Sequence, residues 1–264
     1  MTTEDKKPYS FIHALYLSFF SRQFYQDVGR SWKGYGFVYL LFILILYWAS
    51  ETVRFQSDIS EYVTEAAPAV VSQVPTVTIS RGVASIKEPV PYFINYPDKA
   101  AKETPFIIID TTGQFKSIEN SKAVALVTKT QVVFKKYPAG IRTFDLAGID
   151  KLVIDQNRVN DWIELFRTWF AIILFPFVLF FSWLFHVTQV FLCAFIGTYY
   201  AKRFGVALSY QTLVRLAVVS YTPGIMFQAL HSVLGIEFPS SGLVSFIIAL
   251  GYLYLAVGAN SEAG

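Results

Sequence analysis

The chain has 264 residues, of which 54% are hydrophobic and only 16% charged, and its mean hydropathy is +0.44. Because soluble domains carry about 25% charged residues, this composition excludes a purely soluble enzyme, a disordered chain and a collagen-like chain. The single cysteine, Cys193, excludes a disulfide-stapled secreted module. The net charge of +3 is dispersed along the chain, so we expect no nucleic-acid partner. The composition predicts a membrane protein.

Residues 1–33 form a predicted cytoplasmic segment. Between Tyr9 and Tyr25, apolar residues recur at helical spacing, which predicts an amphipathic helix at the inner membrane interface. The alternative is that this helix packs against the cytoplasmic ends of the membrane spans, and the two roles are compatible.

Residues 34–50 form the first predicted transmembrane helix. A helix needs about 20 mainly apolar residues to cross the hydrocarbon core, and residues 37–46 are continuously apolar. Trp32 and Tyr35 flank one end of this run and Tyr47 and Trp48 the other, as in the aromatic belts of membrane proteins. The run begins too far along the chain for a cleaved signal peptide, so we expect a retained anchor.

Residues 161–258 form a predicted transmembrane bundle, with spans at about 165–201, 213–234 and 243–257 and a short tail at 259–264. The apolar run at 169–201 would make a helix of about 50 Å, longer than one upright span. We expect one tilted helix kinked at Pro176, and the alternative is a tight helical hairpin that raises the total from four spans to five. A second kink is expected at Pro223 and Gly224.

The distribution of Lys and Arg predicts the orientation. Basic residues precede the first span, which predicts a cytoplasmic N-terminus. With four spans, Lys202, Arg203 and Arg215 are also cytoplasmic, whereas five spans would move Lys202 and Arg203 outside. The positive-inside rule therefore favours four spans.

Residues 51–160 form a predicted extracytoplasmic α+β domain inserted into the helical bundle. They contain no spanning run and carry 13 Lys or Arg and 12 Asp or Glu, a balance typical of a folded soluble domain. Helical patterns occur at residues 51–73 and 158–167, at the two ends of the domain. Between them, turns that contain proline or glycine separate segments in which apolar and polar residues alternate. We expect one mostly antiparallel sheet with strands at residues 74–80, 92–95, 105–110, 123–128, 131–135 and 141–144.

The turn at Asp110, Thr111, Thr112 and Gly113 is the sharpest candidate for chemistry. An apolar strand followed by Asp-Thr-Thr-Gly resembles the aspartic-protease loop, but that mechanism needs a second carboxylate and no second copy of the motif occurs. The favoured interpretation is that Asp110 caps the strand and accepts hydrogen bonds from the turn. Residues 51–160 contain no histidine, which excludes a Ser-His-Asp triad there. We predict no enzyme activity, cofactor or metal.

Four polar residues lie at predicted membrane depth: His186, Gln189, Gln228 and His231. Each pair has i, i+3 spacing, so the four side chains form a candidate intramembrane polar site for a ligand. The favoured alternative is that they hydrogen-bond between helices. Cys193 lies in an apolar run and is expected to pack rather than react.

Several short motifs carry a resemblance to known families. The segments Phe-Phe-Ser-Arg-Gln-Phe-Tyr at 19–25, Gly-Tyr-Gly-Phe-Val-Tyr at 34–39, Ile-Ile-Ile-Asp-Thr-Thr-Gly at 107–113 and Thr-Phe-Asp-Leu at 143–146 resemble uncharacterised bacterial membrane proteins of the DUF type. Some of those proteins carry the name maltodextrin-utilisation protein. Residues 209–223 are similar to the Yip-type membrane domain, which implies a helical bundle, usually of five spans, linked to membrane organisation and partner binding.

Together with the resemblance, which implies a bacterial plasma membrane, these observations predict a non-enzymatic scaffold or accessory subunit of a membrane or envelope complex. Its expected partners are membrane lipids and another membrane or envelope protein. The alternative is a small-molecule or lipid binder that acts in transport or sensing, with the four intramembrane polar residues forming its pocket.

Overall fold

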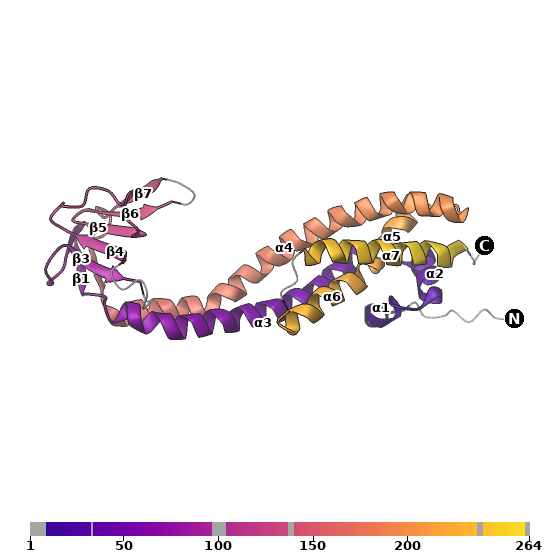
Figure 1. Cartoon of the computed structure of the whole chain (residues 1–264), viewed down its shortest axis with the longest axis horizontal. Helices are drawn as coiled ribbons and strands as arrows, with labels where there is room; N and C mark the ends of the chain where they lie inside the picture. Colours follow the sequence, from indigo (N-terminus) through magenta and orange to yellow (C-terminus); the bar gives the residue numbers. More distant parts are fainter. Residues whose placement is uncertain (1–8, 33, 97–103, 137–139, 237–239, 262–264) are drawn as a thin grey trace. The chain divides into compact units, whose positions relative to one another are not determined.

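A computed structural model of the chain describes residues 9–32, 34–96, 104–136, 140–236 and 240–261 (Figure 1). It divides into two compact units, Met1–Phe55 with Ala171–Gly264, and Gln56–Phe170. We call the first the helical unit and the second the α+β unit. Two long helices, α3 (Gly36–Val71) and α4 (Gln156–Phe204), contribute residues to both units.

The helical unit contains four helical segments that are long and apolar enough to cross a membrane. They are α3, α4, the combined α5 (Tyr210–Ser220) and α6 (Thr222–Val233), and α7 (Ser241–Ser261). The expected helical membrane region with an α+β domain is therefore present. The helical-hairpin alternative is wrong, because α4 continues through Pro176 as one helix of 49 residues.

The chain turns at Tyr221, between α5 and α6, close to the kink expected at Pro223 and Gly224. Pro223 lies in the first turn of α6, where its missing N–H costs no helical hydrogen bond. At the other end of α5, the Ser209 hydroxyl caps the helix by accepting from the Thr212 amide at 3.2 Å.

The N-terminal segment forms two helices rather than the single predicted one. α1 (Phe11–Leu17) ends before Ser21, and α2 (Arg22–Ser31) begins where the Ser21 hydroxyl accepts from the Phe24 amide at 3.2 Å. The buried face of α2, including Phe24, packs into the core of the helical unit with residues of α5 and α7. Ile12 and Phe20 remain exposed, so the interfacial role stays a prediction.

α6 and α7 pack closely at Gly224. A Cβ atom at this position would lie 2.7 Å from the Ser245 carbonyl oxygen, and the Ser245 hydroxyl donates to the Gly224 carbonyl oxygen at 2.8 Å. The absence of a side chain at Gly224 therefore allows the two helices to approach and hydrogen-bond.

A three-stranded sheet joins the ends of α3 and α4 within the α+β unit. Its order is β2 (Val83–Ser85), β1 (Val77–Ser80) and β8 (Lys151–Ile154), with β1 antiparallel to both neighbours. Because β1 follows α3 and β8 precedes α4, the pairing of Val77 with Ile154 holds the two helix ends together. The sequence analysis did not predict β2 or β8.

A second sheet has five strands in the order β3 (Tyr92–Asn95), β4 (Pro105–Asp110), β5 (Ala125–Thr128), β6 (Gln131–Lys135) and β7 (Ile141–Asp145). Only β4 and β5 pair in parallel, through the crossover at residues 111–124. One face packs against residues of the three-stranded sheet, and the other against Ile118 and Ala123 of the crossover. The expected single sheet is thus two, and all six predicted strands are present with shifted ends at β1, β5 and β7.

Candidate functional site

The turn after β4 is organised by Asp110, whose side chain is buried. Its Oδ1 accepts hydrogen bonds from the Thr112 amide at 2.9 Å, the Thr112 hydroxyl at 2.5 Å and the Gly113 amide at 3.2 Å. Its Oδ2 accepts from the Phe115 amide at 2.7 Å. Gly113 has a φ of +84°, a conformation that glycine adopts without strain, and Thr111 lies half-buried in the same turn. Asp110 therefore fixes the start of the crossover.

These hydrogen bonds determine the ionisation of Asp110. Burial raises the pKa of the carboxyl, but the donors from Phe115, Thr112 and Gly113 outweigh it and hold the pKa below the ordinary value of 3.8. An aspartic-protease mechanism would need a second carboxylate beside Asp110. Asp145, at the end of β7, lies three strands away, or about 14 Å, and its Oδ1 accepts from the Ala147 amide at 2.8 Å. The structure does not bring these two carboxylates together, and the geometry agrees with the strand-capping interpretation.

The first pair that the sequence places at membrane depth, His186 and Gln189, lies half-buried on α4. The Nδ1 atom of His186 lies 2.8 Å from the Ser182 carbonyl oxygen, and its ring meets the Tyr221 ring edge to face at 5.9 Å. Tyr221 also lies 3.5 Å from the sulfur of the buried Cys193. The surroundings of His186 are thus those of a helix-packing residue.

The second pair, Gln228 and His231, lies on α6. The Nδ1 atom of His231 lies 3.2 Å from the Ile236 carbonyl oxygen, and Gln228 donates to the Ser241 carbonyl oxygen at 3.5 Å. His231 thus contacts a residue that follows α6, and Gln228 contacts the first residue of α7.

The two pairs lie at different levels of the helical unit. The His186 ring contacts Tyr221, and Gln228 and His231 lie seven and ten residues beyond Tyr221, which corresponds to about 10 and 15 Å along α6. Trp183, near the first pair, donates to the Phe37 carbonyl oxygen at 3.3 Å, whereas Arg54 donates to the carbonyl oxygen of Ser232, next to the second pair, at 2.7 Å. The four-residue site stays a prediction. Among the described residues, no cluster of His, Cys, Asp and Glu has the makings of a metal site.

The outer edge of the five-stranded sheet is a surface that the sequence analysis did not single out. Every residue of β7 is exposed, and the strand has one neighbour, β6. Phe144 is 53% exposed and Ile141 39%, and the Phe144 ring meets the Phe134 ring of β6 edge to face at 5.8 Å. The signal in the sequence was the lack of a one-sided apolar pattern in this strand.

The backbone of β7 directs N–H and C=O groups away from β6 along this edge. The Lys136 amide donates to the Gly140 carbonyl oxygen, and the Leu146 amide to the Thr130 carbonyl oxygen. Antiparallel pairing alternates, so the N–H and C=O groups of Thr143, midway along β7, point away from β6. An edge with this arrangement can accept another strand.

A family model described as a protein of unknown function (DUF1189) matches residues 12–257. The chain belongs to the DUF1189 family. This membership confirms the expected relationship to an uncharacterised family; the maltodextrin-utilisation name and the Yip-type similarity stay predictions. No curated protein and no solved structure matches the DUF1189 chain.

Proposed function

We propose that this protein is a non-enzymatic scaffold or accessory subunit that binds another membrane or envelope protein along β7. The observation that carries the proposal is the fully exposed edge strand with its outward-facing backbone groups. A soluble domain with no partner is expected to protect such an edge, because it can pair with any extended chain. Here the edge carries exposed Ile141 and Phe144 beside the charged Arg142 and Asp145.

The charges near the edge indicate the kind of partner. Lys135, Lys136 and Arg142 are exposed on the β6–β7 hairpin, against one exposed carboxylate on β7, that of Asp145. Ile141 and Phe144 lie on opposite faces of the sheet, and Arg142 shares the face of Phe144. An extended segment that carries both apolar and acidic side chains complements this edge. Backbone hydrogen bonds would give such a complex its affinity, and the side chains its specificity.

The proposal includes the orientation argued from the sequence. The basic residues near the N-terminus and at the end of α4 support a cytoplasmic location for that end of the helical unit in a bacterial plasma membrane. The α+β unit would then lie outside the cytoplasm and meet envelope partners. The Yip-type similarity, which implies partner binding in membranes, agrees with a scaffold role.

A crosslinking pull-down from native membranes tests the proposal with two variants at Thr143. Thr143→Pro removes the outward N–H without breaking the β6–β7 ladder, because that N–H does not bond to β6. Thr143→Val is the matched control, because it keeps the N–H and a β-branched side chain. We expect the wild type and Thr143→Val to recover the same stoichiometric partner and Thr143→Pro to lose it. Equal recovery by both variants, or no partner from the wild type, would contradict the proposal.

A further inference from the structure

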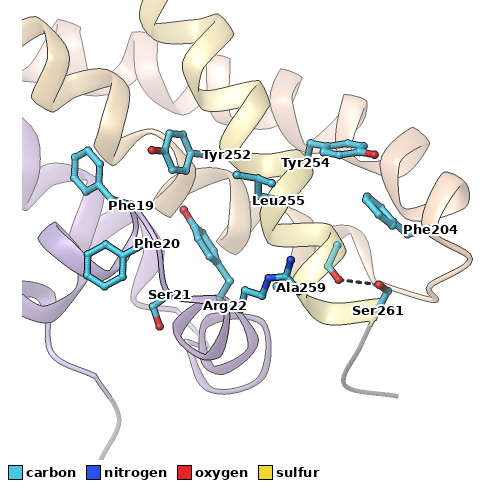
Figure 2. A pocket seen from close by; sticks show the side chains of 12 residues that line it. Phe19, Phe20, Ser21, Arg22, Phe204, Tyr252, Tyr254, Leu255, Ala259 and Ser261 are labelled. Atoms are coloured by element: carbon cyan, nitrogen blue, oxygen red, sulfur yellow. Dashed lines mark hydrogen bonds between the residues drawn. The ribbon is translucent and has the colours of Figure 1, made fainter.

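A cavity of about 300 Å³ lies in the helical unit, between the first turn of α2 and the last turns of α7 (Figure 2). Its walls come from three stretches that are distant in sequence: residues 19–25, Phe204 near the end of α4, and residues 252–261 of α7. It contains none of the four intramembrane polar residues. The site is therefore separate from every candidate discussed above.

The polar lining of the cavity suits an anion. Arg22 is the one charged side chain among its described lining residues, and Figure 2 shows its guanidinium group beside Ala259. Ser21 adds a hydroxyl group whose oxygen accepts from the Phe24 amide and whose O–H can donate to a ligand, whereas the Ser261 hydroxyl donates to the Gly258 carbonyl oxygen at 2.7 Å. A guanidinium group with a neighbouring hydroxyl matches the oxygens of a phosphate or carboxylate.

The apolar lining of the cavity suits a lipid. Phe20 is 71% exposed and Leu255 58%, whereas Tyr25 and Ala259 are buried at the base. Because α7 is long and apolar enough to span a membrane, its last turns lie at a membrane surface if it does so. Exposed Phe and Leu side chains beside Arg22 then lie where acyl chains meet headgroups.

The surroundings of the cavity are also basic. Lys202 and Arg203 are exposed in the last turn of α4, directly before Phe204, which lines the cavity. Basic residues at a membrane surface attract anionic lipids. The charge thus favours an anionic headgroup over a zwitterionic one.

We propose that this cavity binds the headgroup of an anionic phospholipid from the surrounding bilayer. Arg22 contacts the phosphate, the Ser21 hydroxyl donates to a headgroup oxygen, and the acyl chains lie over Phe20 and Leu255. The volume accommodates the headgroup and leaves the chains in the bilayer. This site does not depend on the scaffold proposal, which concerns the α+β unit.

Native mass spectrometry of the full-length, delipidated protein in mild detergent tests the site. Phosphatidylglycerol and phosphatidylcholine are titrated separately, and we expect one phosphatidylglycerol to bind more tightly than phosphatidylcholine. Arg22→Gln should weaken phosphatidylglycerol binding by about five-fold or more, and Arg22→Lys should retain most of it. Arg30→Gln is the matched control, because Arg30 is also exposed on α2 but lies outside the cavity lining.

Three outcomes would overturn the proposal. They are equal binding of the two lipids, equal loss in Arg22→Gln and Arg30→Gln, and displacement of phosphatidylglycerol by glycerol 3-phosphate at equal concentration, which would indicate a site for a free phosphate ester. A thermal melt of each variant checks folding, and Arg22→Lys keeps the test informative if Arg22→Gln unfolds.

Discussion

Asp110 supports the α+β unit through four hydrogen bonds from the turn that follows it. Each bond favours the charged carboxylate, so the stability of the unit is linked to the ionisation of this residue. The same bonds engage both oxygens, as expected of a residue that holds the turn.

We predict that Asp110→Asn destabilises the α+β unit by about 2–3 kcal/mol at neutral pH, because hydrogen bonds to a charged group are lost. The pKa of Asp110 is lowered on folding, so its contribution is complete above the ordinary value of 3.8 and is lost as the pH falls through the folded pKa. The difference between wild type and variant should therefore shrink below about pH 4. Urea unfolding of the full-length protein, followed by circular dichroism at several pH values, measures it.

Asp145→Asn is the control, because Asp145 is exposed and its side chain accepts a hydrogen bond from the Ala147 amide. A neutral-pH difference no larger than that of Asp145→Asn would contradict the structural role of Asp110, and so would a difference that persists at pH 2.

The hydrogen bonds of the Asp110 turn could be predicted from the sequence. The arrangement in space of His186, Gln189, Gln228 and His231 could not. An Asp-Thr-Thr-Gly turn is a local feature, since its donors lie within five residues of the acceptor. The separation of His186 from His231 depends instead on where α4 and α6 pack along α3. A helical spacing within each pair carries no information on that distance.

At the scale of elements, close packing of α6 on α7 depends on Gly224. Its missing side chain lets the Ser245 carbonyl oxygen approach to a distance at which no Cβ atom fits. Gly251, also on α7, has nothing within 4 Å of an added Cβ atom. The two glycines therefore have opposite roles in the stability of the helical unit.

We predict that Gly224→Ala destabilises the helical unit by about 1–3 kcal/mol, because the α6 and α7 backbones must separate. Gly251→Ala should be neutral or stabilise by up to about 1 kcal/mol, because it removes a glycine from a helix interior. Thermal unfolding of both variants in the same detergent provides the comparison. A Gly224→Ala protein as stable as Gly251→Ala would contradict the packing described.

The helices and strands could be predicted from the sequence where an apolar run was long or where the segment was clearly bounded by turn residues. The apolar run in α4 and the segment Pro105–Asp110 are such cases. β2 and β8 are only three and four residues long, and β8 is stabilised by pairing with the distant β1. The single N-terminal helix was wrong because the Ser21 cap starts a second helix inside a continuous apolar periodicity.

At the scale of the whole molecule, the proposed orientation makes a testable prediction. In a Cys193→Ala background, a membrane-impermeant thiol reagent added to intact cells should label Glu119→Cys in the α+β unit. Ala207→Cys, between α4 and α5, should be labelled only after permeabilisation. Both positions are exposed, so accessibility of the side chain does not limit either reaction. The reverse pattern would contradict the orientation.

The central claim is that a partner adds a strand to β7, and residue-resolved hydrogen exchange tests it most directly. The full-length protein is compared alone and with the partner recovered in the pull-down. We predict that the Ile141 and Thr143 amides, which point away from β6, become protected when the partner binds, while those of Arg142 and Phe144, already bonded to β6, change little. Unchanged exchange at Ile141 and Thr143 in the complex would contradict the claim.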